Sequence, residues 1–113
     1  MNWEEFSRKI DGEIKVDSEV PKTDGRTRKV IKIVGSRIYL RTGVKTRATK
    51  YTTKEMLQYA YGKIQSGGQF TSNDFKIRFP RECSQGDCVF SMTGGILEVL
   101  GEAKHIHGGY IKK

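Results

Sequence analysis

The chain has 113 residues, of which 35% are apolar and 30% are charged, and its formal net charge is +8. This length suits one domain with one modest core, and the composition is that of a globular chain and not of a disordered one. No apolar run approaches the roughly 20 residues of a membrane-spanning helix, and two cysteines imply no disulfide framework. Residues 1–5 lack the basic and apolar stretches of a signal peptide. We therefore expect a single cytoplasmic domain over residues 1–113.

The positive charge is concentrated in one stretch of the sequence. Residues 22–54 contain eleven Lys or Arg and one acid, Asp24, whereas residues 1–21 are acidic and residues 55–113 are nearly balanced. Like charges at this density repel each other, and a polyanion would relieve the repulsion and release its own counterions. The pattern predicts a nucleic-acid partner, and a solubilising charged face is the alternative.

Residues 1–28 predict a helix followed by a basic connection. Trp3, Phe6 and Ile10 recur at the spacing of one helical face. We expect this face to pack on a sheet, with the alternative that Trp3 contacts a protein partner or a second copy of the chain. Residues 11–28 contain few large apolar side chains and predict a mobile connection.

Residues 29–51 predict a basic β-hairpin and arm. Gly35-Ser36 separates two strand-like runs, and glycine first in a two-residue turn favours type II′. The expected pairs are Val34–Arg37, Ile33–Ile38, Lys32–Tyr39, Ile31–Leu40 and Val30–Arg41. Because side chains alternate along a strand, one face would be apolar and buried. Its members would be Ile31, Ile33, Ile38 and Leu40.

The other face of this hairpin would be basic and exposed. There Tyr39 either stacks on a sugar or base, or covers the alkyl stem of Lys32. Residues 44–50 follow with bases and hydroxyls, and we expect either a third strand or a basic arm whose side chains reach phosphate oxygens.

Residues 52–113 predict a helical core with a C-terminal hairpin. Thr52 with Glu55, and Thr71 with Asp74, have the spacing of capping boxes at two helix starts. The first helix should end near Ser66, before two glycines, and the second before Pro80. Alternation over residues 75–79 leaves a strand as the alternative for the second.

A third helix is expected over residues 87–101, although Gly94-Gly95 lies in its middle, where each glycine costs about 1 kcal/mol relative to alanine. Residues 103–112 predict a hairpin about Gly108-Gly109. An all-β arrangement of residues 86–112 is the alternative.

The order of these elements from residue 30 onward resembles the winged helix-turn-helix domain, most closely in residues 96–101, the Gly-Gly hairpin and Tyr110 of its return strand. The resemblance implies that residues 87–101 are a recognition helix and that residues 103–112 are the wing. The fold class we expect is α+β: a winged-helix-like domain with an N-terminal helix and a basic β-hairpin before a three-helix core. The expected recognition helix has no Lys or Arg, so Gln85, Ser91 and Thr93 are its expected base-reading residues.

We therefore expect a nucleic-acid-binding protein without catalytic residues, cofactor or metal, and double-stranded DNA as its partner. It would act as a small transcription regulator or as the DNA-reading module of a larger system such as a restriction system. An RNA-binding or ribosome-associated protein is the first alternative. The expected contact residues are Arg26, Arg28, Lys29, Lys32, Arg37, Tyr39, Arg41, Lys45, Arg47, Lys50, Gln85, Ser91, Thr93, Lys104, His107 and Lys112.

Two more specific functions remain as alternatives, a nuclease site and a zinc site. Asp87 with Glu102 and Lys104 has the loose spacing of a magnesium-dependent nuclease. A zinc site is the other, because two cysteines and two histidines are zinc-compatible ligands. They are Cys83, Cys88, His105 and His107.

Overall fold

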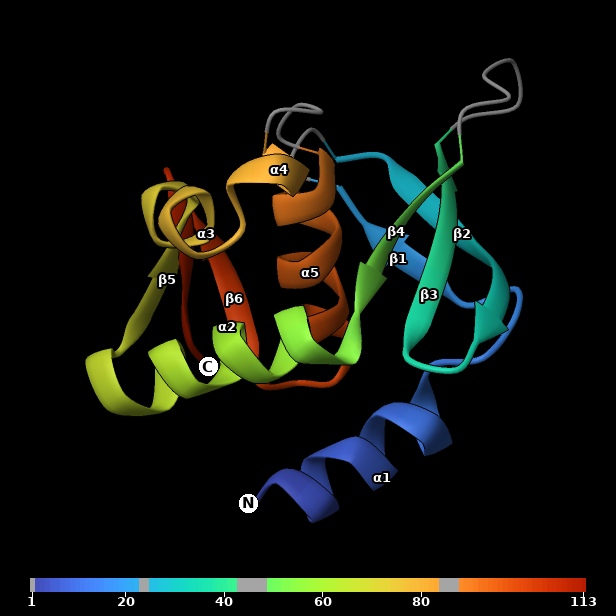
Figure 1. The fold of residues 1–113 in the computed structure, drawn as a ribbon, viewed down its shortest axis with the longest axis horizontal. Helices are drawn as coiled ribbons and strands as arrows, with labels where there is room; N and C mark the ends of the chain where they lie inside the picture. Colours follow the sequence, from blue (N-terminus) through green and yellow to red (C-terminus); the bar gives the residue numbers. More distant parts are fainter. Residues whose placement is uncertain (1, 23–24, 43–48, 84–87) are drawn as a thin grey trace.

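The computed structural model describes residues 2–22, 25–42, 49–83 and 88–113. This part of the chain forms an α+β domain in which one helix lies between two antiparallel sheets (Figure 1). The first half contains α1 (Trp3–Glu13), β1 (Glu19–Pro21), β2 (Thr27–Val34), β3 (Arg37–Thr42) and β4 (Thr49–Thr53). Its four strands form a sheet in the order β1-β2-β3-β4.

The second half of the chain contains the central helix α5 and further elements around it. Its elements are α2 (Lys54–Gly67), β5 (Gln69–Thr71), α3 (Ser72–Arg78), α4 (Pro80–Cys83), α5 (Cys88–Val99), β6 (Ala103–Ile106) and β7 (Gly109–Lys112). The three strands form a second sheet in the order β5-β7-β6. The expected α+β class is therefore confirmed, and so is the C-terminal hairpin, whose turn contains Gly108 with a φ of 82°.

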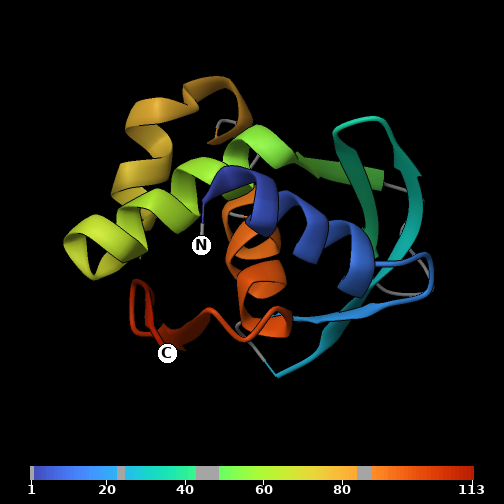
Figure 2. The ribbon, with the colours of Figure 1, turned by 90° about the horizontal axis from the view of Figure 1, so that it is seen from below.

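The N-terminal helix is confirmed, and it buries the expected face. The side chain of Asn2 accepts a hydrogen bond from the Glu5 amide and caps the helix. Phe6 is fully buried and stacks on Tyr61 of α2, with 4.2 Å between the ring centroids. Lys9 forms an ion pair of 2.7 Å with Glu102. These contacts place α1 against α2 and the turn after α5 (Figure 2).

The connection between α1 and β2 contains more structure than the sequence predicts. Val20 of β1 is fully buried, although residues 11–28 were expected to be mobile. Backbone hydrogen bonds join Asp17 and Ser18 to Val30 and close this segment onto β2. A few buried side chains and a short strand are enough to order a segment that is otherwise polar.

The register of the β2–β3 hairpin is confirmed near the turn and wrong beyond it. The three pairs from Val34–Arg37 to Lys32–Tyr39 form as expected, and Gly35 has the positive φ, 58°, of a type II′ turn. A β-bulge then intervenes, so that Val30 pairs with Leu40 and Lys29 with Arg41. Because the bulge adds one residue to β2, side chains on its far side exchange faces.

Consequently Val30 joins Ile38 and Leu40 in the core, and Ile31 is 38% exposed. Ile33 keeps its expected pair with Ile38 but is 39% exposed near the turn. The expected burial of these two isoleucines is wrong.

One of the two expected helix caps is displaced by one residue. The amide of Met56 donates to the Thr53 hydroxyl at 3.1 Å, so Thr53 caps α2 and the assignment of Thr52 is wrong. Strand β4 continues through Thr53, and its alternation turns Thr52 inward. The Thr71 capping box of α3 is confirmed, with both hydrogen bonds to Asp74.

The helix ends follow local sequence signals. α2 ends at Gly67, and Gly68 adopts the left-handed conformation with a φ of 79°. Residues 75–78 are helical, so the strand alternative there is wrong, and Pro80 begins α4 after the break.

Helix α5 is also confirmed, so the all-β alternative is wrong, and its paired glycines have a packing role. A Cβ atom on Gly94 would overlap the Tyr110 ring of β7, and one on Gly95 would lie 2.7 Å from the carbonyl oxygen of Pro21 in β1. The two glycines therefore allow both sheets to approach the same helix.

Candidate nucleic-acid interface

The outer side of the first sheet carries four cations and two tyrosines: Lys29, Lys32, Arg37, Arg41, Tyr39 and Tyr51. Alternation and register place them together: Lys29 pairs with Arg41, Lys32 with Tyr39, and Tyr39 with Tyr51. All four cations are exposed, and the two tyrosines are half-buried. We call this surface the basic face, and its members are Lys29, Lys32, Arg37, Tyr39, Arg41 and Tyr51.

The two tyrosines are in contact and are flanked by cations. The rings of Tyr39 and Tyr51 are 5.3 Å apart between centroids and tilted by 50°. The guanidinium carbon of Arg37 is 4.8 Å from the Tyr51 centroid, and the ammonium of Lys32 is 5.3 Å from that of Tyr39. Arg37 also donates a hydrogen bond of 3.5 Å to the Tyr39 hydroxyl, and this bond raises the pKa of Arg37 above its ordinary value.

Sequence reasoning missed Tyr51, which was not among the expected contact residues. Its place on the basic face depends on β4 pairing with β3.

Little negative charge offsets these cations. Glu19 of β1 is exposed and pairs with Lys29 across the sheet edge. Within the part of the chain that the structure describes, Lys29, Lys32 and Arg41 take part in no ion pair. Glu19 offsets part of the charge at Lys29, and the remaining positive charge faces solvent, which favours an anionic partner.

Arg28 does not belong to this surface, and its expected contact with DNA is a misassignment. The bulge turns it inward beside Val30, where its side chain is 3% exposed. Its Nη2 donates a hydrogen bond of 2.8 Å to the Ser91 hydroxyl in α5. No hydrogen-bond partner for its Nε or Nη1 occurs among the described residues.

The expected base-reading residues of α5 that the structure describes are also buried. Every residue from position 89 to 97 is buried, including Ser91 and Thr93. The Thr93 hydroxyl donates to the Val89 carbonyl at 2.8 Å and lies 2.7 Å from the Thr52 hydroxyl of β4. Their burial does not fit a role in reading bases. Ser91 and Thr93 are both directed to side chains of the first sheet, Arg28 and Thr52.

The expected contact residues of the β6–β7 hairpin lie apart from the basic face. Lys104, His107 and Lys112 are exposed on the second sheet, and α5 separates them from the first sheet (Figure 1). Lys50 pairs with Leu40, which is directed into the core, so it is not on the side of Tyr39. Arg26 is exposed just before β2. Lys45, Arg47 and Gln85 lie outside the described residues.

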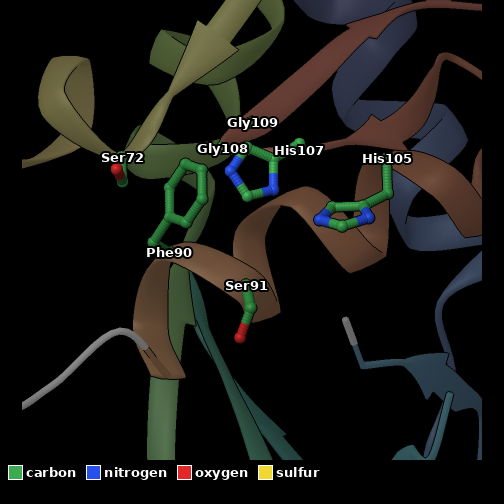
Figure 3. Close-up of a pocket in the computed structure, with 7 residues that line it drawn as sticks. All are labelled: Ser72, Phe90, Ser91, His105, His107, Gly108 and Gly109. Carbon is green, nitrogen blue, oxygen red and sulfur yellow. The ribbon is translucent and has the colours of Figure 1, made fainter. Parts of the chain in front are cut away.

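A cavity of about 330 Å³ opens beside the β6–β7 hairpin (Figure 3). His105 and His107 reach it from this hairpin, Phe90 and Ser91 from α5, and Ser72 from the start of α3. Within residues 2–22, 25–42, 49–83 and 88–113, no group of three or more potential ligand residues could hold a metal ion. The zinc hypothesis also needs the side chains of Cys83 and Cys88, which lie outside the description.

Glu102, the carboxylate of the nuclease hypothesis, has a structural partner. Its side chain accepts from Lys9 of α1 at 2.7 Å. This interaction, more than any other, raises the pKa of Lys9. Lys104 is exposed on β6, and Asp87 lies outside the described residues. The three residues are therefore not seen as one site.

Comparison with protein-family models, with curated proteins and with solved structures finds no match. Among the described residues, no helix combines the length and apolar character needed to cross a membrane.

Proposed function

We propose that this protein binds nucleic acid through the basic face of the four-stranded sheet. The observation that carries the proposal is the presence of four exposed cations and two adjacent tyrosines on one side of three neighbouring strands. Cations of this kind neutralise phosphates and release counterions, and aromatic rings add contacts to sugars or bases. The winged-helix resemblance points to double-stranded DNA, whereas the charge distribution by itself fits a nucleic acid of either strandedness.

The second half of the chain supports a winged-helix-like architecture. Its order is α2, β5, α3, α5 and the β6–β7 hairpin, with the short α4 before α5, and β5 completes a sheet with that hairpin. In this proposal α5 is a scaffold between two sheets, because its polar side chains are used internally. In this proposal the nucleic acid is therefore bound by the first sheet, which covers α5, and not by α5 itself.

The proposal is tested by removing charge from the basic face. We expect the triple variant Lys29→Gln, Lys32→Gln and Arg41→Gln to remain folded, since all three side chains are exposed. Fluorescence anisotropy with a labelled duplex should show weaker binding at every salt concentration. The slope of log K against log salt should fall by about two to three, at roughly 0.9 per lost phosphate contact on B-form DNA.

A matched control removes three charges from the other sheet, by Lys104→Gln, Lys112→Gln and Lys113→Gln. This variant has the same net charge as the first, so a contribution from overall charge alone would weaken both equally. Equal losses, or an unchanged affinity and slope in the first variant, would contradict binding at the basic face. Competition between duplex DNA and structured RNA then decides between the two classes of partner.

A further inference from the structure

We infer that the basic face binds unpaired bases of single-stranded nucleic acid, which stack on Tyr39 and Tyr51. The inference rests on the proposed function and names the strandedness of its ligand. Both rings are half-buried, and a cation lies over each of them, Lys32 over Tyr39 and Arg37 over Tyr51, which a stacking base would displace toward its own phosphates. Aromatic side chains on an open sheet provide a stacking surface for any base, because every base has a π-face.

The topology disfavours a groove of duplex DNA as the site. The major groove is about 12 Å wide and admits a helix or a two-stranded β-ribbon. Here the β2–β3 hairpin is not a separate ribbon, because β1 and β4 flank it in the sheet. Four strands spaced at about 4.8 Å exceed that width. Helix α5, which the winged-helix resemblance would place in a groove, is buried.

The cations are placed to hold the backbone of a strand whose bases lie on the tyrosines. Arg37 and Arg41 are two residues before and two residues after Tyr39, at about 7 Å along β3. Lys29 lies opposite Arg41, and Lys32 lies opposite Tyr39. A nucleotide on Tyr39 would therefore have a cation on each side along the strand. Duplex DNA would use these charges but not the rings, because its base faces are covered by stacking.

The experiment measures the role of the rings with charge unchanged. The ligands are a labelled oligothymidylate 12-mer, an oligouridylate 12-mer and a mixed-sequence 12-base-pair duplex. The proteins are the parent, Tyr39→Leu with Tyr51→Leu, and Tyr39→Phe with Tyr51→Phe. Since each stacked base contributes about 1–3 kcal/mol, the leucine variant should bind both single strands at least tenfold more weakly. The phenylalanine variant should stay within about threefold of the parent.

The salt slope should be the same in all three proteins, because stacking neutralises no phosphate. Thermal unfolding followed by circular dichroism identifies any variant that is not folded. Independently of any variant, irradiation of the parent with an oligonucleotide containing 5-iodouridine should cross-link Tyr39 or Tyr51. Similar affinity for the DNA and RNA strands is expected, since the rings read no 2′-hydroxyl.

Three outcomes would overturn the inference: a folded leucine variant with parental single-strand affinity, cross-links confined to the wing, or tighter binding of the duplex than of either strand. The proposed function survives all three if the charge variant still loses affinity relative to its matched control. If the parent binds none of the nucleic acids, the proposed function fails with the inference.

Discussion

Gly94 and Gly95 show how two neighbouring residues decide the packing of three elements. Glycine is unfavourable inside a helix, but here the absence of a side chain leaves room for the Tyr110 ring of β7. The neighbouring Gly95 makes the same space for the backbone of β1. The propensity cost is local, whereas the packing benefit comes from residues far away in sequence.

We expect Gly94→Ala to lower the free energy of unfolding by about 1–3 kcal/mol, because overpacking forces the ring and helix apart. Gly62→Ala is the control: Gly62 is exposed in α2, and a Cβ atom there would meet nothing within 4 Å. That variant should gain up to about 1 kcal/mol from helix propensity. Urea denaturation measures both, and a change of the same sign in the two variants would contradict this account of Gly94.

A second residue-scale prediction concerns the start of α2. Thr53→Ala should cost about 0.5–2 kcal/mol of stability, because the Met56 amide loses its capping oxygen. Thr53→Ser keeps that oxygen and should restore most of the loss. If chemical denaturation gives the two variants equal stability, the hydroxyl of Thr53 does not cap this helix.

At the scale of elements, local signals were enough to predict much of the fold. The Thr71 box, the glycines after α2 and the turn at Gly35 each act within a few residues, and all three are confirmed. The β2 bulge depends on pairing with β3 and on burial of Val30, so no local pattern reveals it. The same bulge places Arg28 in the core, which no local pattern predicts. Five members of the basic face were therefore predicted as contact residues, whereas Tyr51 was missed and Arg28 was wrongly included.

The bulge predicts that deletion of Ile31 and deletion of Ile33 have different effects on nucleic-acid binding. Deleting Ile31 removes the extra residue and leaves Val30 directed inward and Lys32 outward in a regular ladder. Deleting Ile33 also gives a regular ladder, but moves Lys32 opposite Ile38 and therefore off the basic face. We expect the first variant to bind nucleic acid like the parent.

The Ile33 deletion should bind more weakly, with a salt slope smaller by about one, because one phosphate contact is lost. Anisotropy titrations at several salt concentrations measure both variants, and circular dichroism checks their folding. Parental binding by both folded deletions would show that Lys32 is not part of the interface.

At the scale of the whole molecule, the two sheets are joined through α5 and Tyr110. Thr52 of β4 contacts Thr93, and Arg28 of β2 contacts Ser91. Tyr110 of β7 is fully buried over the same helix, and its hydroxyl donates to the Ser91 carbonyl at 3.4 Å. Such an arrangement should unfold as one cooperative unit, because neither sheet retains a covered inner side without α5.

This junction also predicts a loss of stability at alkaline pH. Burial raises the pKa of Tyr110 far above the ordinary tyrosine value of about 10. Below pH 10 both the folded and unfolded states hold the phenolic proton. Above it the unfolded state releases the proton while the folded state keeps it, so the free energy of unfolding falls as pH rises. This group alone contributes a slope of about 1.4 kcal/mol per pH unit.

Tyr110→Phe removes the titrating hydroxyl and keeps the ring over Gly94, so it should make the decline between pH 10 and 12 shallower by about that slope. Tyr39→Phe, on the exposed basic face, is the control and should follow the parent. Urea denaturation at half-unit pH steps measures the three curves. An equal decline in the parent and in Tyr110→Phe would mean that the Tyr110 hydroxyl titrates alike in both states. The junction between the two sheets would then be open to water, contrary to the full burial on which its cooperative unfolding depends.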